Sequence, residues 1–515
     1  TRSNAGAAHM SAAQLNRSRP IYLDYAATTP VDARVAGCMA ECLTAAGDFG
    51  TPASTHAYGR EARTRVESAR AQVAALVGAR PGEVIFTSGA TEADNLAILG
   101  LARGARAARG AQALHVISAR TEHKAVLDPC RQLEREGIAV TLLTPADEGR
   151  VTPAQLQAAL RPETVLVSLM HANNETGAIQ DVAAFGALCR AHGAAFHVDA
   201  AQSAGKLPID VQAMGIDLLS FTAHKLYGPK GIGALYVQAA RRVTLQPLMF
   251  GGGHERGLRS GTLAVHQIVG FGAACALAAH MMGGEAVRQA QLRARLWAGV
   301  GSLPGALLNS PSVHALPGVL NVSFAGIEGE SLLFGLTELA LASGSACNSD
   351  SDEPSYVLRA IGRDRETAQS ALRFSLGRDT SPEDIDTAIA AVRREVLRLR
   401  SLAAVSASGG EPECVASGEA GAREQGTWVR FMLKMEGGTI AEASHQAYGC
   451  PQTLAACEWL SGQLRGRPWA DPGLGGALDW ARALQLAPDR LTRLLVIEDA
   501  LRAALAAAQR RVAPG

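Results

Sequence analysis

Short runs of apolar, β-branched residues alternate with longer stretches of helical periodicity between about Pro20 and Arg400. Most of these runs are followed by a helix or a loop, which predicts an α/β fold built on a mostly parallel sheet. Ligands bind such sheets at the carboxyl edge, where Gly- and Ser-rich joints follow the runs in this chain. The predicted strands are Val84–Thr87, Leu114–Ser118, Val140–Leu143, Thr164–Met170, Ala195–Val198, Leu218–Phe221 and Gly233–Val237.

A second, smaller α/β lobe is expected beyond the pair Gly283–Gly284, where a long helical stretch begins near Glu285. Val319–Phe324 and Ala371–Leu376 are its predicted strands, because both are short and apolar. Asp384–Leu402 has strong helical periodicity and is expected to close this lobe.

The composition changes at Ala403. The stretch Ala403–Gln425 is rich in Ala, Gly, Ser and Glu without usable periodicity, which predicts a flexible linker. Trp428–Met435 then alternates like a strand, and a Gly-Gly pair turns it toward a hairpin partner at Ile440–Ala447. Helices dominate from Gln452 to Arg511, so a separate α+β unit is expected here.

These patterns predict five segments. An N-terminal arm (1–19) includes Thr1–His9, which resembles an expression-tag remnant ahead of a native start at Met10. A large domain (20–280) follows, and its first residues (20–33) are expected to pack with the small domain (281–402). A linker (403–426) then leads to the C-terminal unit (427–515).

Charge and composition exclude several classes of partner. The 515 residues include 49 basic and 48 acidic side chains, with no long block of one sign, so neither nucleic acid nor an anionic membrane is expected as a partner. No uninterrupted apolar run of membrane-spanning length and no signal segment is evident, which predicts a cytoplasmic protein. The nine cysteines are scattered without a Cys-x-x-Cys pair or zinc spacing, so no metal site is predicted.

The segment DLLSFTAHKLYGPKGIG carries the first chemical signal. Lys225 follows an apolar strand and precedes a Gly- and Pro-rich turn, a place where partial desolvation makes an amine nucleophilic. Pyridoxal phosphate needs such a lysine, an acid for its ring nitrogen and a phosphate cup. Asp199 ends an apolar strand, and Ser88–Thr91 precedes a helix whose free N–H groups suit phosphate. Each residue alone has an ordinary structural explanation, but the set in this order favours the cofactor.

Cys347 is the second signal, within LASGSACNSDSDEPSYVL. It lies among Ser, Gly, Asn and Asp with no apolar periodicity, whereas Cys189 and Cys275 lie in apolar runs. A cysteine on an exposed loop suits a nucleophile that accepts a group at the cofactor and passes it on. On its own, Cys347 could equally be an idle exposed thiol.

Taken together, the motifs from Ile21 to Asp386 resemble those of the cysteine desulfurases, specifically the housekeeping subgroup with a long catalytic loop. The resemblance implies the pyridoxal-phosphate fold type I, an aminotransferase-like fold with large and small domains, in a homodimer with active sites at the subunit boundary. It is carried by IYLDYAATTP, FTSGATEADNLAI, TEHKAVLDPCRQLEREG, SLMHANNETG, FHVDAAQSAGKLPID, GGGHERGLRSGT, SGSACNSDSDEPSYVLRAIG and LRFSLGRDTSPEDID.

The resemblance implies a role for each matching residue. Lys225 corresponds to the Schiff-base lysine, Asp199 to the partner of the ring nitrogen and His123 to the ring that stacks on the cofactor and handles protons. Asn174 and Gln202 correspond to residues beside the substrate and a cofactor oxygen, and Arg373 to the clamp on the substrate carboxylate. The phosphate would be held by Ala90, Thr91, Thr222 and His224, with Thr262 from the other subunit.

The implied reaction takes sulfur from L-cysteine. Lys225 removes the α-proton, the Cys347 thiolate attacks the substrate sulfur, and the products are a persulfide on Cys347 and L-alanine. The sulfur then passes to an acceptor protein for iron–sulfur cluster, thio-cofactor or tRNA synthesis. The alternatives are a selenocysteine lyase type of relative, which the long Cys347 loop disfavours, and a sulfur-trafficking adaptor with an inactive desulfurase.

The C-terminal unit resembles, more weakly, the U-type iron–sulfur cluster scaffold. Such scaffolds hold a cluster through three cysteines and an Asp or His. Only Cys450 matches; the other ligand positions hold Gln425, Thr427, Thr492 and Arg493, so the scaffold is degenerate. Two interpretations stay open: a docked unit that directs sulfur to another acceptor, or a relay in which Cys450 takes sulfur from Cys347.

Overall fold

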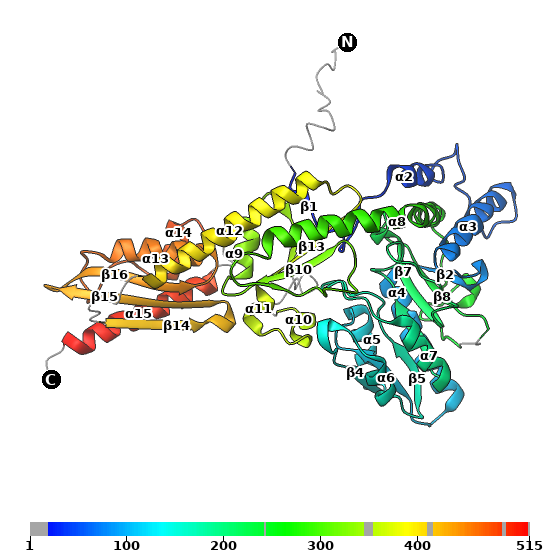
Figure 1. Ribbon diagram of the computed structural model, residues 1–515, viewed down its shortest axis with the longest axis horizontal. Helices are drawn as coiled ribbons and strands as arrows, with labels where there is room; N and C mark the ends of the chain where they lie inside the picture. The colour runs from blue at the N-terminus through cyan, green and yellow to red at the C-terminus, as the bar shows by residue number, and fades with distance from the viewer. Residues whose placement is uncertain (1–18, 241–243, 344–353, 409–415, 487–490, 513–515) are drawn as a thin grey trace, which may run out of the picture.

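The computed structural model describes residues 19–240, 244–343, 354–408, 416–486 and 491–512. They form a large domain, a small domain and a C-terminal unit, which lies at one end of the molecule beyond the small domain (Figure 1). All seven predicted strands of the large domain are present and form one sheet. Its order is β2 (Val84–Thr87), β8 (Gly233–Val237), β7 (Leu218–Thr222), β6 (Ala195–Asp199), β5 (Thr164–Ser168), β3 (His115–Ala119) and β4 (Ala139–Leu143).

Two helical layers cover this sheet, because alternate residues of each strand point to opposite faces. Phe221 of β7 joins a core with α3, α7 and α8, whereas Leu218 of the same strand joins a second core with α4 and α5. Strand β8 is antiparallel to both neighbours, and the other strand pairs are parallel. The predicted mostly parallel α/β sheet is therefore confirmed. The helices are α2 (Ala33–Ala40), α3 (Ala57–Leu76), α4 (Ala90–Arg109), α5 (Lys124–Arg135), α6 (Pro153–Ala159), α7 (Val182–His192) and α8 (Val265–Val300).

The small domain has an antiparallel sheet in the order β12 (Ala342–Ser343), β13 (Ala371–Ser375), β10 (Val319–Phe324) and β9 (Ala306–Leu308). The N-terminal segment returns to this domain, since β1 (Ile21–Tyr22) pairs with β11 (Leu339–Ala340). The segment after β1 continues beside β13, since Asp24 forms a bridge with Ser375. Arg373 of β13 therefore lies at the boundary with the large domain, where it lines a cavity. The small helices of this domain are α9 (Gly329–Gly335), α10 (Tyr356–Ala360) and α11 (Arg365–Gln369).

Helix α8 corrects the expected break between the two domains. It runs without interruption through Gly283 and Gly284, where a helix beginning near Glu285 was predicted. An added Cβ at either glycine would meet open space, so these glycines are exposed helix positions and mark no turn. A mid-helix glycine costs only about 1 kcal/mol relative to alanine, and packing of α8 on α2, α3 and the later helix α12 (Pro382–Ser408) offsets this. Helix α8 also has the length and hydropathy of a membrane span, but half of its most apolar window is buried in protein, as in a core helix.

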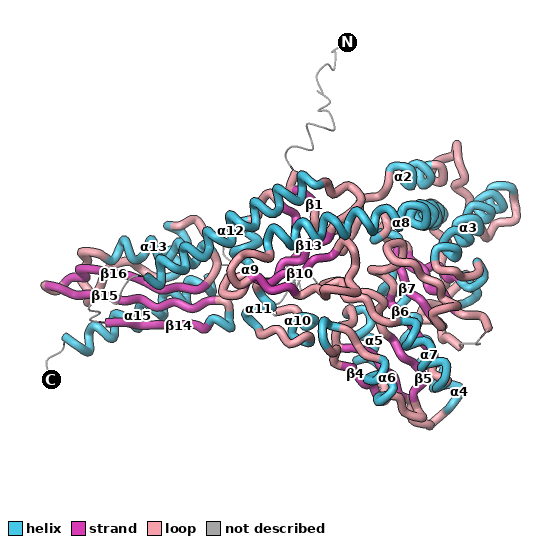
Figure 2. Tube along the Cα trace, in the orientation of Figure 1, coloured by secondary structure: helices cyan, strands magenta, loops and turns pink. Residues whose placement is uncertain are grey.

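The C-terminal unit is a three-stranded antiparallel sheet with helices packed against it (Figure 2). The predicted hairpin is confirmed: Gly437 and Gly438, both with positive φ, connect its two strands. Tryptophan, phenylalanine and aliphatic side chains from strands and helices make one core. The elements are β14 (Ala416–Ala422), β15 (Thr427–Glu436), β16 (Thr439–Tyr448), α13 (Pro451–Leu464), α14 (Ala477–Ala483) and α15 (Leu491–Val512).

The predicted linker was wrong over much of its length. Helix α12 (Pro382–Ser408) continues to Ser408, and β14 begins at Ala416, so only 409–415 lies outside the described residues. Strand β14 is built from Ala, Gly, Ser and Glu, whose low hydrophobicity hid it from pattern analysis. The small side chains have a packing reason: a Cβ on Gly418 would come within 2.0 Å of the Ala504 backbone of α15.

Candidate active site

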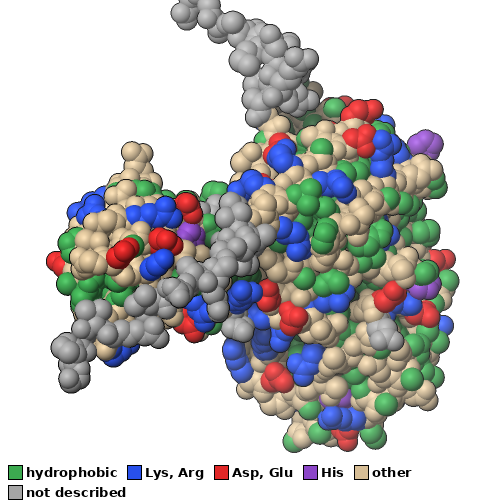
Figure 3. Space-filling view, turned by 60° about the vertical axis from the view of Figure 1, so that its left-hand side comes forward, with side chains coloured by type: hydrophobic (Ala, Val, Ile, Leu, Met, Phe, Trp, Pro, Cys, Tyr) green, Lys and Arg blue, Asp and Glu red, His purple; other side chains and the backbone are tan. Residues whose placement is uncertain are grey.

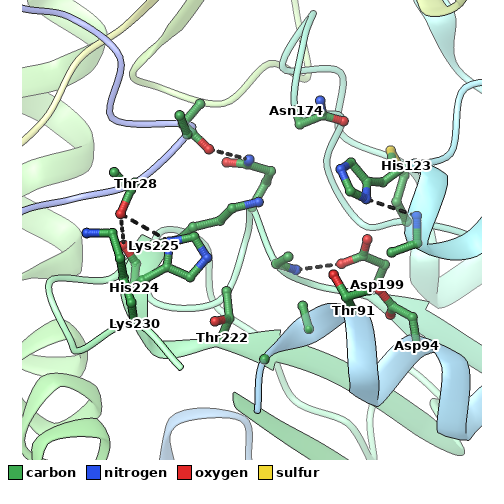
Figure 4. Close-up of a pocket in the computed structure, with 18 of the residues that line it drawn as sticks. Thr28, Thr91, Asp94, His123, Asn174, Asp199, Thr222, His224, Lys225 and Lys230 are labelled. Atoms are coloured by element: carbon green, nitrogen blue, oxygen red, sulfur yellow. Dashed lines mark hydrogen bonds between the residues drawn. The ribbon is translucent and has the colours of Figure 1, made fainter. Parts of the chain in front are cut away.

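A cavity of about 580 Å³ opens at the carboxyl edge of the large sheet, beside the small domain. Residues from the ends of β2, β6 and β7 and from the starts of α4 and α5 converge on it (Figure 4). The predicted site residues that line it are Ala90, Thr91, His123, Asn174, Asp199, Gln202, Thr222, His224, Lys225 and Arg373. Segments separated by almost 300 residues therefore meet in one place, as the motifs predicted.

Lys225 ends the 3-10 turn η4 (Ala223–Lys225), which follows directly on β7. The turn is tied to the N-terminal segment, since the His224 carbonyl accepts a hydrogen bond from Thr29 Oγ1 (2.9 Å). His224 Nδ1 lies 3.2 Å from Thr28 Oγ1, and burial lowers the pKa of His224 to about 4, so the ring is neutral. These contacts hold the lysine at the sheet edge with its side chain in the cavity (Figure 4).

The start of α4 forms the anion-binding end of the cavity. Ala90 and Thr91 are its first residues, and a helix of 20 residues presents free N–H groups and a positive dipole there. The backbone comes close to the neighbouring strand, because a Cβ on Gly233 would lie 2.7 Å from Gly89. Thr222 Oγ1 donates to the Ile232 carbonyl (3.2 Å) and keeps its position at the end of β7.

Asp199 and His123 come from the same edge of the sheet, at the end of β6 and after β3, with β5 between these two strands. The Asp199 Oδ1 accepts from the Ala201 N–H (2.8 Å), which fixes the carboxylate at the end of β6. His123 precedes α5, and its Nδ1 accepts from the Ala125 N–H (3.1 Å). Burial lowers the pKa of His123, and the charge of Lys225 lowers it further. The ring is therefore neutral with its proton on Nε2, since Nδ1 is the acceptor.

Asn174 and Arg373 form the opposite end of the site. The Arg373 side chain is only 4% exposed, and it contacts Asp24 Oδ1 through Nη2 (2.7 Å) and the Asn174 carbonyl through Nη1 (2.9 Å). The Asn174 Oδ1 and the Arg373 Nε are buried without a hydrogen-bond partner among the described residues. Unsatisfied buried polar atoms of this kind point to a polar ligand.

These residues fit pyridoxal phosphate. The cavity offers a lysine amine, a carboxylate held at a strand end, a helix start for a phosphate, and buried polar atoms without partners. The lysine suits the aldehyde of the cofactor, the carboxylate its ring nitrogen and the helix start its phosphate. The unpaired polar atoms suit the substrate that is joined to the cofactor.

Other predicted residues lie elsewhere. Thr262 is exposed and does not line the cavity of its own chain. Cys347 lies outside the described residues, which stop at Ser343 and resume at Pro354. Cys450 directly precedes α13 in the C-terminal unit, is 3% exposed, and is close enough to Arg493 to interact with its guanidinium. Among the described residues, no group of three or more His, Cys, Asp or Glu side chains is placed to hold a metal.

Sequence reasoning missed four polar residues that line the cavity: Thr28, Glu92, Asp94 and Lys230. All four lie inside motifs that were singled out, but their sequence context gave them no chemical role. Asp94 is 1% exposed, and its carboxyl lies 3.5 Å from His197 Nε2. Burial raises the pKa of Asp94, and the charge of Asp199 raises it further.

Comparison with known proteins agrees with this geometry. A family model described as aminotransferase class-V matches residues 21–387. The cysteine desulfurase IscS of Pectobacterium atrosepticum is 56% identical over 384 residues, which are 74% of this chain and 94% of that protein. The cysteine desulfurase IscS of Escherichia coli O139:H28 is 55% identical over the same shares of both chains.

Solved structures give the same result. A NifS-like protein is 35% identical with a TM-score of 0.67, covering 74% of this chain and all of the other. A structure described as SspA in complex with cysteine is 38% identical with a TM-score of 0.61, covering 69% of this chain and 98% of the other. The chain therefore belongs to the class-V aminotransferase family, as a pyridoxal-phosphate-dependent cysteine desulfurase.

Proposed function

We propose that the chain converts L-cysteine to L-alanine, holds the released sulfur as a persulfide on Cys347 and delivers it to an acceptor protein. The meeting of Lys225, Asp199 and His123 with Arg373 in one cavity is the observation that supports this most strongly. Formation of L-alanine from L-cysteine by the purified protein tests it, and absence of alanine contradicts it.

Arg373 is proposed to hold the substrate carboxylate. Its planar guanidinium is buried and already engages a carboxylate, that of Asp24, through Nη2. A substrate carboxylate would compete with Asp24 or share the guanidinium with it, and the fork geometry suits two oxygens. The unpaired Asn174 Oδ1 is suited to accept from a substrate or cofactor group beside it.

Replacement of Arg373 by lysine tests this role. Lysine keeps the charge but loses the fork, so we expect the KM for L-cysteine to rise by about 10- to 100-fold. Steady-state kinetics provide the measurement, and kcat is expected to fall by a smaller factor. An unchanged KM in Arg373→Lys would place the carboxylate elsewhere.

Proton handling is proposed for two residues. When bound, pyridoxal phosphate supplies an electron-accepting ring that weakens the Cα–H bond of the amino acid joined to it. Lys225 takes the α-proton on its amine once substrate has replaced it. His123 carries its proton on Nε2, the nitrogen not used by the Ala125 N–H, and exchanges it with the reacting molecule.

Sulfur transfer needs a thiolate. The Cys347 sulfur forms a bond to the substrate sulfur while the substrate Cβ–S bond breaks. The electron pair of the broken bond stays with the three-carbon fragment, which takes up a proton and leaves as L-alanine. A thiol acceptor later attacks the outer sulfur, and Cys347 returns to its thiolate form.

A homodimer is proposed on two observations. Thr262, which the motifs assign to a neighbouring subunit's phosphate site, is exposed on this chain. Large apolar side chains are also exposed, including Phe250 (82%), Phe49 and Tyr58. A second copy would bury these side chains and bring its Thr262 to the cavity.

The C-terminal unit is proposed to be a degenerate scaffold that docks on the small domain. Figure 3 shows it as a lobe set apart from the main body. Arg493 joins the two parts, because its Nη2 lies 2.8 Å from Glu330 Oε2 of α9. Ser331 Oγ donates to the Gly449 carbonyl (3.1 Å), directly before Cys450, and α12 packs on β16.

Charge reversal at Arg493 tests this docking. In Arg493→Glu a carboxylate would face Glu330 and Glu328, so α9 amides are expected to exchange hydrogen about tenfold faster. The radius of gyration in solution scattering is expected to increase. Adding Glu330→Arg recreates an opposite-charge pair and should restore both values toward the wild type. Identical exchange in Arg493→Glu and the wild type would contradict the docking role.

Burial of Cys450 favours docking over the relay interpretation. The thiol is 3% exposed, and its sulfur lies 3.3 Å from Thr453 Oγ1 within its own unit. Mass spectrometry of cysteine-treated protein should therefore find added sulfur on Cys347 and not on Cys450. Added sulfur on Cys450 would instead favour a relay.

A further inference from the structure

A second lysine lies behind the cofactor cavity. Lys206 follows Gln202 by one turn, and its Nζ donates a hydrogen bond to Gln202 Oε1 (3.3 Å). The other end of the same amide is also fixed, since Gln202 Nε2 donates to the Ala26 carbonyl (2.9 Å). Gln202 lines the cavity, whereas Lys206 does not. The two contacts set the orientation of the amide and leave one N–H of Nε2 for a ligand.

Lys206 also shares a space with Lys225. Both line a small cavity of about 20 Å³, together with Tyr25, Tyr227, Glu285 and Arg378. Such a volume holds about one water molecule, so the space that the two lysines share contains little solvent, and the charge of Lys225 acts on Lys206. Their charges therefore interact in a poorly screened environment.

The charged groups around Lys206 are mainly cationic. The positive charges of Lys225 and Arg373 both disfavour protonation of Lys206. The carboxylate that lines the same small cavity, Glu285, forms an ion pair with Arg378. Burial, with smaller contributions from Lys225 and Arg373, lowers the pKa of Lys206 to about 7. Lys206 is thus cationic below neutral pH and increasingly neutral above it.

We propose that Lys206 is a positioning residue that orients Gln202 toward the cofactor and, by its positive charge, favours the unprotonated form of the Lys225 nitrogen. This inference rests on the proposed function, because it assumes that Lys225 carries the cofactor. A like charge nearby always disfavours protonation, so the presence of Lys206 lowers the pKa of the Lys225 nitrogen and its removal raises it.

The test is a pH titration of the visible absorption of the lysine-bound cofactor in three proteins. Lys206→Met removes the charge and keeps much of the volume, so its midpoint is expected to rise by about one pH unit. Lys206→Arg keeps a charge at every pH, so its midpoint is expected at or below that of the wild type. The fluorescence-detected unfolding midpoint of each variant is measured alongside.

The order of the three midpoints decides the inference. If Lys206 had only a structural role, both variants would change the unfolding midpoint. Their absorption midpoints would then not shift in opposite directions from the wild type, upward in Lys206→Met and downward in Lys206→Arg. Equal titration midpoints in all three proteins would overturn the inference and leave the proposed function standing. A wild-type protein with no lysine-bound absorption would overturn both.

Discussion

Replacing Lys225 by alanine is expected to lower the turnover of L-cysteine by at least about 10⁴-fold and to remove the visible absorption of the lysine-bound cofactor. Proton transfer by a positioned side chain alone contributes about 10²- to 10⁴-fold, and Lys225 is also the proposed point of attachment. No other amine is held at the end of β7 by contacts of this kind among the described residues. Absorption spectra and alanine formation measure the two effects.

Lys230 provides a matched control for Lys225. It lines the same cavity five positions further along the chain. Lys230→Ala is expected to keep the absorption of the lysine-bound cofactor, because attachment is assigned to Lys225. If the absorption survives in Lys225→Ala and disappears in Lys230→Ala, the assignment of the attachment lysine is wrong.

Replacing Cys347 by serine is expected to leave the lysine-bound absorption intact and to lower sulfide release, measured with a reductant, by at least about 10³-fold. A serine oxygen cannot take sulfur from the substrate as a persulfide, whereas the proposed cofactor cavity is lined by other residues among those described. The absorption in this variant shows that the loss comes from chemistry and not from failure to fold.

Cys450→Ser is the control for this second prediction. Cys450 is buried in the C-terminal unit, away from the cavity, so its removal is expected to leave sulfide release within about twofold of the wild type. Undiminished sulfide release in Cys347→Ser would remove the persulfide from the proposed reaction.

The large domain was predictable because its strands are buried on both faces. Strand β7 is buried along its whole length and mainly apolar, and its one internal polar residue, Ser220, is paired with His197 (2.9 Å), so the run Leu218–Phe221 still indicates the strand and its end. Lys225 and Asp199 could be placed at this edge for the same reason, since Asp199 ends β6 and Lys225 lies just beyond β7. The side chains that meet them from α4 and α5 followed from the motifs.

Features set by packing between distant segments were not predictable. Strand β14 has almost no apolar side chains, and its identity depends on the close approach of Gly418 to α15. Helix α8 passes through Gly283 and Gly284 because contacts at both of its ends outweigh two unfavourable residues. In the site, the pairing of Arg373 with Asp24 joins residues 349 positions apart, which no local pattern could indicate.

The sequence places Lys206 four residues after Gln202, but it does not indicate that the two side chains act together in a site. Two residues four positions apart lie on one side of a helical turn, yet this spacing is common among surface residues. What distinguishes Lys206 is its surroundings, namely Lys225 and Arg373 from distant parts of the chain. Only the folded arrangement brings these three cations together.

A single-turnover experiment without reductant tests the central claim most directly. Protein loaded with pyridoxal phosphate is mixed with about half an equivalent of L-cysteine per subunit, so that little free thiol remains to remove the added sulfur. The alanine formed is quantified, and peptide mass mapping locates the added sulfur. About one alanine is expected per L-cysteine added, with the added sulfur on the peptide that contains Cys347. Alanine formed in that amount with Cys347 unmodified would contradict this claim.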